Sequence, residues 1–339
     1  MISSAQTSAS GHFLRQCQFA NNKYYRLNVS PIFSGWPLTT MRHTSLLCLL
    51  ARCGLFAACL LSVSSAQAQW ATVDWTIAET LLAIDAPVSS VAQQSDYHEW
   101  VGEPRIPDNV SDMGLRAQPN LELLAQEPPE QTLISPMFVG LTPRLEKIAP
   151  VSLFSLYSPG TDTWQEMQKL TRQLGELTEH QPQAEALIAE TQALMTTLRE
   201  SRPLSQSEIA PLLMVQFMDA RHVRVFGENS LYNAVLEQLE LPNAWDQATN
   251  AWGFALVGIE ALARHPEAML VIIDPLPAGV EEQLAKSGLW QQLPSVKHDK
   301  LVHLPPAWSF GALPSAQRFA QELAAALETA PAVSHHVNE

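Results

Sequence analysis

The stretch AEALIAETQALMTTLRE, residues 184–200, decides the fold of this chain. Its apolar side chains recur at the spacing of one helix face, and Thr191 interrupts them at what we expect to be the edge of that face. The apolar members are Leu187, Ile188, Leu194, Met195 and Leu198. From Thr163 to Arg202 the sequence holds helix formers and almost no strand pattern. We therefore predict one long helix at residues 179–202, with a different pattern on either side of it.

On the N-terminal side of this helix, short apolar segments alternate with amphipathic ones. Strands are predicted at 71–75, 88–93, 131–136 and 151–156, and helices at 77–84, 120–127 and near 143–148. Alternation of this kind is typical of an α/β layer with a mainly parallel sheet. Residues 69–178 are therefore predicted to form an N-terminal α/β lobe.

The alternation returns on the C-terminal side. Strands are predicted at 211–219, 222–227, 269–274 and 300–305, and helices at 230–241, 280–288 and 314–330. Ser230 suits the N-cap of the first of these helices, and Gly288 is expected to stop the second. We assign residues 203–330 to a C-terminal α/β lobe and residues 331–339 to a disordered tail. Two lobes joined by a helix predict an α/β fold with a ligand cleft between the lobes.

The segment before residue 69 has the features of a secretory signal peptide. It contains Arg42 and Arg52, an apolar run from Cys53 to Val63, and the small-residue site Ala66-Gln67-Ala68. The apolar run is shorter than the ~20 residues that a membrane span needs. We expect residues 41–68 to be removed by cleavage after Ala68. Residues 1–40 are then an upstream extension, or alternatively part of a long charged leader.

Cysteine content and charge agree with export. All four cysteines lie before residue 69, so residues 69–339 rely on their core rather than on disulfides. Acylation at Cys59 is a weaker alternative, because this residue lies inside the apolar run. Residues 1–68 hold five of the 20 Lys and Arg and none of the 34 Asp and Glu, which leaves 15 basic and 34 acidic residues and a net charge of −19. Nucleic-acid binding needs clustered basic residues, so we expect no nucleic-acid partner. An acidic, exported chain fits the periplasm, and we expect it to be a monomer.

Motifs for catalysis are missing from the sequence. The chain has no G-x-G-x-x-G, G-x-x-x-x-G-K-[ST], H-E-x-x-H or G-x-S-x-G motif. Its tightest polar cluster, Asp219, Arg221 and His222, suits a turn between strands. The histidines are scattered rather than spaced as metal ligands. We therefore expect neither an enzyme nor a metal or cofactor held by the protein itself.

Aromatic residues and one arginine stand on loops that follow predicted strands. They are Arg116, Phe138, Trp252, Trp308 and Phe310. Ligands of open α/β sheets bind in the crevice beyond the carboxyl ends of the strands. As a set, these side chains predict a site for a ligand with apolar bulk and a few acceptor oxygens.

Four segments of the chain resemble a known family. They are DMGLRAQPNLELL (112–124), RHVRVFGENSLYNAVLEQLELPNAW (221–245), TNAWG (249–253) with VGIEALA (257–263), and PPAWSFGALPSA (305–316). In this order and spacing they resemble the periplasmic ferric-hydroxamate siderophore-binding proteins of ABC importers, the FhuD-like family. The resemblance runs from about Val73 to Leu327. It implies two α/β lobes bridged by a long helix, and a role in delivering an iron(III)–siderophore to an inner-membrane permease and its ATPase.

The resemblance also implies roles for individual residues. An arginine that donates to the hydroxamate oxygens matches Arg116, and aromatic residues of the cleft match Phe138, Trp252, Trp308 and Phe310. Tyrosines are familiar where Phe138 and Phe310 stand, which puts the identity of the siderophore in doubt. An acidic residue that docks the C-terminal lobe on the permease matches Glu260. On the N-terminal lobe the position falls near Pro143, and Glu146 is the nearest candidate.

Two tryptophans seven residues apart are expected to differ in role. Trp252 is interpreted as cleft wall and Trp245 as the core residue that holds its loop. The same fold with a carboxylate siderophore, haem or a corrinoid stays an alternative, and a second arginine in the cleft, Arg105 or Arg221, would favour a carboxylate siderophore. An esterase or reductase acting on the siderophore is the alternative of a different class.

Overall fold

The computed structural model describes residues 69–158, 160–201 and 209–329. The expected upstream extension, signal peptide and C-terminal tail lie outside these ranges. Within them, no helix has both the length and the apolar character to cross a membrane.

The N-terminal lobe is built on a five-stranded sheet of order β3-β2-β1-β6-β7, and every pairing in it is parallel. A small hairpin, β4 with β5, stands beside it. The strands are β1 Trp70–Thr72, β2 Val88–Val91, β3 Ser111–Asp112, β4 Gly114–Leu115, β5 Gln118–Pro119, β6 Gln131–Ile134 and β7 Val151–Leu153. The helices are α2 Trp75–Ala83, α3 Gln94–Trp100, α4 Leu121–Gln126, the 3₁₀ helix η1 Pro136–Leu141 and α5 Thr142–Leu145.

The C-terminal lobe has a mixed sheet of order β10-β9-β8-β11-β12. Strands β8, β11 and β12 are parallel, whereas β9 is antiparallel to both β8 and β10. The strands are β8 Leu212–Phe217, β9 His222–Phe226, β10 Phe254–Gly258, β11 Met269–Ile273 and β12 Leu301–Leu304. The helices are α9 Leu231–Gln238, the 3₁₀ helix η2 Ile259–Arg264, α10 Val280–Ala285, α11 Gly288–Gln292, α12 Pro294–Lys297 and α13 Leu313–Thr329.

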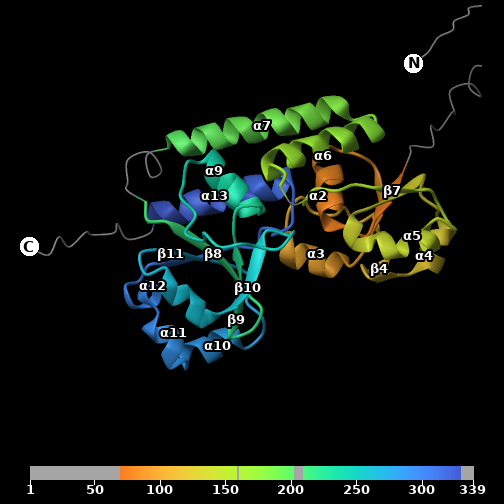
Figure 1. Ribbon diagram of the computed structural model, residues 1–339. Coiled ribbons are helices and arrows are strands. Elements are labelled where there is room, and N and C mark those ends of the chain that lie inside the picture. Colours follow the sequence, from red (N-terminus) through yellow and green to blue (C-terminus); the bar gives the residue numbers. More distant parts are fainter. Residues whose placement is uncertain (1–68, 159, 202–208, 330–339) are drawn as a thin grey trace, which may run out of the picture. The chain divides into compact units, whose positions relative to one another are not determined.

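Two helices, α6 Thr163–Leu177 and α7 Gln181–Glu200, connect the lobes. They pack side by side (Figure 1), and α7 also contacts α9 and α13 of the C-terminal lobe. Gly175 allows the close approach, because a Cβ there would lie 2.5 Å from the Cβ of Ala184. The long helix predicted from the sequence is α7, and it is joined by a second helix that the sequence interpretation did not separate.

Thr191 was expected at the edge of the α7 face, and this is wrong. Its side chain is fully buried. The Thr191 hydroxyl donates to the carbonyl oxygen of Leu187 at 2.6 Å and accepts from the amide of Gln317 on α13 at 2.7 Å. A hydroxyl can be buried there because both of its hydrogen-bonding functions are satisfied.

Several element ends differ from the sequence prediction for identifiable reasons. The strand predicted at 71–75 ends at Thr72, because Asp74 caps α2 by accepting from the backbone N–H groups of Thr76 and Ile77. Ser230 caps α9 as predicted. Gly288 does not end a helix but begins α11, whose N-cap is Ser287.

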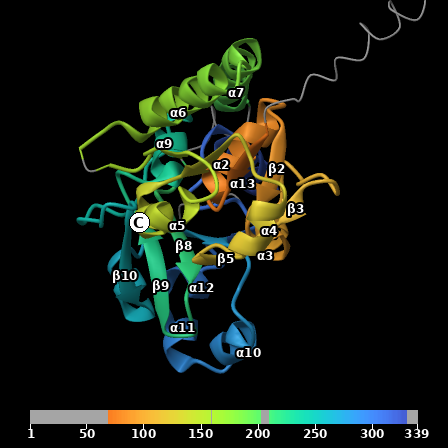
Figure 2. The same cartoon turned by 90° about the vertical axis from the view of Figure 1, so that its right-hand side faces the viewer.

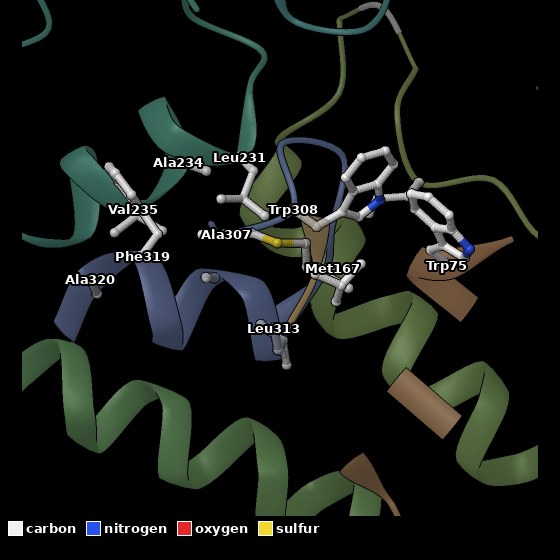
Figure 3. Packing of buried hydrophobic residues seen from close by; sticks show 14 of the residues in the cluster. Trp75, Met167, Leu231, Ala234, Val235, Ala307, Trp308, Leu313, Phe319 and Ala320 are labelled. Carbon is white, nitrogen blue, oxygen red and sulfur yellow. The ribbon is translucent and has the colours of Figure 1, made fainter. Parts of the chain in front are cut away.

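One apolar core extends through both lobes. It includes Trp75 and Leu81 of α2, Met167 of α6, and Tyr232 and Phe319 of the C-terminal lobe. Figure 3 shows part of it, with side chains of α9 above those of α13. Smaller clusters lie on the other face of each sheet. Because the main core is continuous, moving one lobe away from the other would expose apolar surface to water.

Glu79 of α2 joins the lobes by capping a helix of the opposite lobe. Its carboxyl accepts from the backbone N–H of Ala312 and from the hydroxyl of Ser315, both at 2.5 Å, at the start of α13. The side chain is fully buried. Burial raises the pKa of Glu79 from 4.5 to about 8, the Asp74 carboxylate also raises it, and the two hydrogen bonds oppose this change. The folded protein therefore holds Glu79 largely protonated at neutral pH.

This shift predicts a pH dependence of stability. Between pH 4.5 and about 8 the folded state binds a proton at Glu79 that the unfolded chain has lost, so the free energy of unfolding should fall as pH rises through this window. In Glu79→Gln the side chain cannot titrate, and its amide can still form hydrogen bonds with Ala312 and Ser315. The free energy of unfolding of this variant should therefore fall less steeply as pH rises. Urea unfolding at several pH values measures this, with the exposed Glu146→Gln as control. Parallel profiles for wild type and Glu79→Gln would contradict the assignment.

Candidate ligand-binding site

The site lies where the strand order of the N-terminal sheet reverses. From β1 the chain proceeds to β2 and β3 on one side, whereas β6 and β7 lie on the other. Asp74 and Ser135 follow the carboxyl ends of β1 and β6, and the Ser135 hydroxyl donates to Oδ2 of Asp74 at 2.5 Å. Such a reversal leaves a crevice beyond the strand ends. The floor of the site is therefore set by the topology of this sheet.

Arg116 occupies the turn of the β4–β5 hairpin and reaches over this crevice. Its Nε donates to the carbonyl oxygen of Val73 at 3.0 Å. Its guanidinium carbon lies 4.1 Å from the ring centroid of Trp75, 5.0 Å from that of Phe138 and 5.5 Å from that of Trp308. Three aromatic rings from both lobes thus hold one cation in place.

The charge of Arg116 is half-buried and only partly compensated. Burial lowers its pKa, and the nearby Asp74 carboxylate raises it. Among the described residues, no carboxylate forms an ion pair with Arg116 and no acceptor bonds its terminal nitrogens. These N–H groups therefore remain available to a ligand as a planar fork of donors.

Aromatic rings form the wall on the other side of the crevice. The ring centroids of Trp308 and Phe310 are 5.3 Å apart, those of Trp252 and Phe310 are 6.0 Å apart, and those of Tyr157 and Trp252 are 6.4 Å apart. Trp308 also lies against Trp75 across the lobes, with centroids 5.0 Å apart (Figure 3). The result is a continuous aromatic surface that extends from Arg116 into the C-terminal lobe.

The segment 308–312, which carries Trp308 and Phe310, is held by the N-terminal lobe. The Thr76 hydroxyl donates to the carbonyl oxygen of Phe310 at 2.7 Å, and Nε1 of Trp308 donates to that hydroxyl at 3.3 Å. The Tyr157 hydroxyl donates to the carbonyl oxygen of Gly311 at 2.7 Å. Together with Glu79, these bonds fix the position of the aromatic wall relative to Arg116.

A cavity of about 240 Å³ lies between these groups. Four of the five ligand-binding residues predicted from the sequence line it: Arg116, Trp252, Trp308 and Phe310. The other lining residues are Asp74, Thr76, Ile77, Ser135, Pro136, Met137, Phe154, Ser155, Leu156, Tyr157, Leu170 and Ala251.

Phe138 was expected to line the cleft, and the structure places it elsewhere. It is only 7% exposed and belongs to the core cluster on the other face of the N-terminal sheet. There its ring centroid lies 5.0 Å from the guanidinium carbon of Arg116. The 3₁₀ turn after Ser135, which begins with Pro136, directs Phe138 inward and leaves its neighbour Met137 at the cavity.

Trp252 and Trp245 differ as the sequence suggested. Trp245 is 6% exposed and packs in the second core cluster of the C-terminal lobe. Trp252 is half-buried and lines the cavity on a turn that Asn250 stabilises by accepting from the Trp252 backbone N–H. Gly253 ends this turn with φ +79°, and a Cβ there would lie 2.5 Å from the backbone of Ser230. Only glycine can therefore close the loop that presents Trp252.

Neither arginine proposed as a second cleft cation is in the cleft. Arg105 is exposed and pairs with Glu103, with Nε 3.5 Å from a carboxylate oxygen. Arg221 is exposed in the turn between β8 and β9, where Asp219 accepts from the backbone N–H groups of Arg221 and His222. The polar cluster at this turn is thus explained by turn geometry.

Sequence reasoning missed the polar residues of the cavity lining other than Arg116, among them Asp74, Ser135 and Tyr157. Each of these three follows the end of an observed strand of the N-terminal sheet, β1, β6 or β7, so the rule that selected Arg116 selects them once the strand ends are known. Asp74 was overlooked because the strand was extended to Trp75. Tyr157 directly follows the strand predicted at 151–156, and the sequence interpretation did not select it.

Two α/β lobes joined by helices, with an aromatic cavity at their junction, define a two-lobed substrate-binding protein. A model of the family described as periplasmic binding protein matches residues 71–307. The chain belongs to this family, whose siderophore-binding members deliver their ligand to an ABC permease.

Named relatives agree with this assignment. The iron(3+)-hydroxamate-binding protein FhuD of Escherichia coli (strain K12) is 32% identical over 251 residues, covering 74% of this chain and 84% of that protein. The crystal structure of FhuD from Vibrio cholerae with Fe³⁺–Desferal bound is similar with a TM-score of 0.74 and 26% identity, covering 78% of this chain and 100% of that one. These similarities confirm the resemblance identified from the sequence.

A more distant structure shares the fold alone. The triscatecholate siderophore binding protein FeuA from Bacillus subtilis, complexed with Ferri-Bacillibactin, has a TM-score of 0.62 and 15% identity, covering 78% of this chain and 94% of that one. Because the same fold is found in a protein described for a different chelate chemistry, the ligand of this chain must be argued from its site.

The anchoring of segment 308–312 can be tested at Thr76. Thr76→Val keeps the shape but leaves the Phe310 carbonyl and the Trp308 N–H without their partner, which should lower the free energy of unfolding by about 1–3 kcal/mol. Hydrogen exchange at Gly311 and Ala312 should also become about tenfold faster. Thr80→Val is the control, because the Thr80 hydroxyl donates to the carbonyl oxygen of Thr76 within α2 and has no other partner in the described ranges. Equal exchange in both variants would show that Thr76 does not hold the segment.

Proposed function

We propose that the protein binds an iron(III)–siderophore of the hydroxamate type in this cavity and delivers it to an ABC importer. The observation that carries the proposal is the geometry of Arg116, whose terminal N–H groups face an aromatic cavity and have no hydrogen-bond partner among the residues that the structure describes. Hydroxamate oxygens are acceptors for such a fork, and the siderophore itself supplies the oxygens around iron. The names of the relatives from E. coli and V. cholerae support the same ligand class.

The charge of the site favours a neutral chelate over a strongly anionic one. Arg116 and Asp74 both line the cavity, so their formal charges cancel. In an iron(III) trishydroxamate the negative charges of the hydroxamates cancel that of the metal. A triscatecholate keeps a large negative charge and would meet Asp74 in the cavity, where Arg116 is the one cation among the lining residues. Aromatic faces suit the apolar exterior of the hydroxamate complex.

We also propose how the complex reaches the importer. Glu260 on η2 and Glu146 after α5 are exposed and lie on different lobes, as docking residues on a two-lobed protein should. Exposed charges at an interface contribute to orientation and association rate. In this proposal the monomeric protein works in the periplasm, after removal of residues 41–68 as a signal peptide.

Arg116 is the residue to test for ligand binding. Arg116→Ala removes charge-assisted hydrogen bonds of ~1.5–3 kcal/mol, so affinity for an iron(III) trishydroxamate should fall roughly ten- to a hundredfold. Arg116→Lys should recover only part of it, because an ammonium lacks the planar fork. Quenching of tryptophan fluorescence measures the affinity, and the exposed Arg144→Ala is the control. Unchanged binding by Arg116→Ala would place the ligand elsewhere, and recovery of chemically altered siderophore would favour the esterase or reductase alternative.

Glu260 tests docking separately from binding. Glu260→Arg should leave the affinity for the chelate within about twofold of wild type, because the side chain is exposed and outside the cavity, while uptake of the iron complex by cells falls several-fold. Glu282→Arg makes the same charge change on an exposed position of α10 and should preserve uptake. Loss of chelate binding by Glu260→Arg would assign this residue to the fold or the cavity instead.

A further inference from the structure

A second arginine, Arg224, lies at the end of the aromatic wall that belongs to the C-terminal lobe. It is on the central part of β9, paired in register with Gln216 of β8 and Leu256 of β10. Figure 2 shows β9 between these two strands. Its guanidinium carbon is 5.0 Å from the ring centroid of Phe254 and 5.6 Å from that of Phe310. Phe310 lines the cavity, so Arg224 is separated from the cavity by one ring.

Arg224 has little compensation for its charge. Its Nη1 donates to the side-chain oxygen of Gln216 at 3.1 Å, and no other hydrogen bond of its side chain occurs among the described residues. No carboxylate in these ranges forms an ion pair with it. Partial burial lowers the pKa of Arg224, and the nearby Tyr232 opposes this change. Contacts with two aromatic rings stabilise the cation only modestly.

The two arginines bracket the same pair of rings. Arg116 lies beside Trp308, the Trp308 and Phe310 centroids are 5.3 Å apart, and Arg224 lies beside Phe310. The Asp74 carboxylate lines the cavity with Arg116 and offsets part of its charge, whereas the partners of Arg224 among the described residues are Gln216 and two aromatic rings. Arg116 and Asp74 together therefore present little net charge to the centre of a bound ligand. Arg224 adds positive charge at one end of the site.

The small cavity brings the periphery of a ligand near Arg224. Its volume of about 240 Å³ is below the ~300–1,000 Å³ of pockets that enclose a drug-sized ligand. A larger chelate must extend beyond it. On β10, Leu256 lies opposite Arg224 and is 61% exposed, so this edge of the sheet faces solvent. Groups on the outside of the chelate can reach the guanidinium there.

We propose that Arg224 is a specificity-determining residue that favours hydroxamate chelates with a peripheral carboxylate. This inference rests on the function proposed above for the cavity. Arg116 contacts the oxygens near iron, while the fork of Arg224 binds a carboxylate on the outside of the complex in a charge-assisted, bidentate manner. Chelates without this anion bind through Arg116 and the aromatic wall alone.

The experiment compares two ligands that differ in charge. One is the neutral iron(III) complex of a cyclic trihydroxamate without ionisable substituents. The other is the anionic iron(III) complex of a citrate-derived dihydroxamate with free carboxylates. Arg224→Met keeps the apolar length and removes the charge, and Arg224→Lys keeps the charge without the fork. Arg221→Met, an exposed arginine outside the cleft, is the matched control.

We expect Arg224→Met to weaken binding of the anionic complex roughly ten- to a hundredfold, and that of the neutral complex by less than about twofold. Arg224→Lys should be intermediate for the anionic complex, and Arg221→Met should bind both like wild type. Equal losses for both ligands would show that Arg224 only supports the rings of Phe254 and Phe310, and would overturn the proposal. So would an unchanged ratio of the two affinities. If wild type binds the neutral complex but not the anionic one, this inference alone fails; if it binds neither, the proposed function fails with it.

Discussion

A buried carboxyl on one lobe caps a helix of the other, and the candidate ligand-binding site depends on this contact. Glu79 of α2 accepts hydrogen bonds at the start of α13, and Thr76, one turn earlier on α2, holds the carbonyl of Phe310. The segment that these two residues hold, just before α13, carries Trp308 and Phe310. Hence the helix that follows Asp74 at the floor of the cavity also fixes the opposite wall. The site is a product of the junction between lobes rather than of either lobe.

The same junction explains how a cation can be kept ready for a ligand. Arg116 is surrounded by Trp75 and Phe138 of its own lobe and by Trp308 of the other, and its Nε is bonded to the carbonyl of Val73. These contacts hold the guanidinium in one orientation before any ligand arrives. A preorganised donor loses less conformational entropy on binding. The continuous core beneath it opposes large movements of the lobes.

The site was partly predictable because some of its determinants are local. Arg116, Trp252, Trp308 and Phe310 stand on loops after strands, and the rule that ligands bind beyond strand ends selects them. Phe138 satisfies the same rule but is turned into the core by the 3₁₀ turn after Ser135. Thr191 looked like the edge of a helix face until α13 was placed against it. Arg224 was not singled out, because a charged residue within a predicted strand usually faces solvent.

Periodicity and capping residues determine many of the elements of this protein, since both act over a few residues along the chain. They were enough to predict two α/β lobes, the long helix α7 and the cap at Ser230. The tertiary structure alone decides which side chains meet in the cavity. Thr76 and Phe310, bonded through a hydroxyl and a carbonyl, are 234 residues apart. No local pattern encodes such a contact, because the partner of each group is determined by how two lobes pack together.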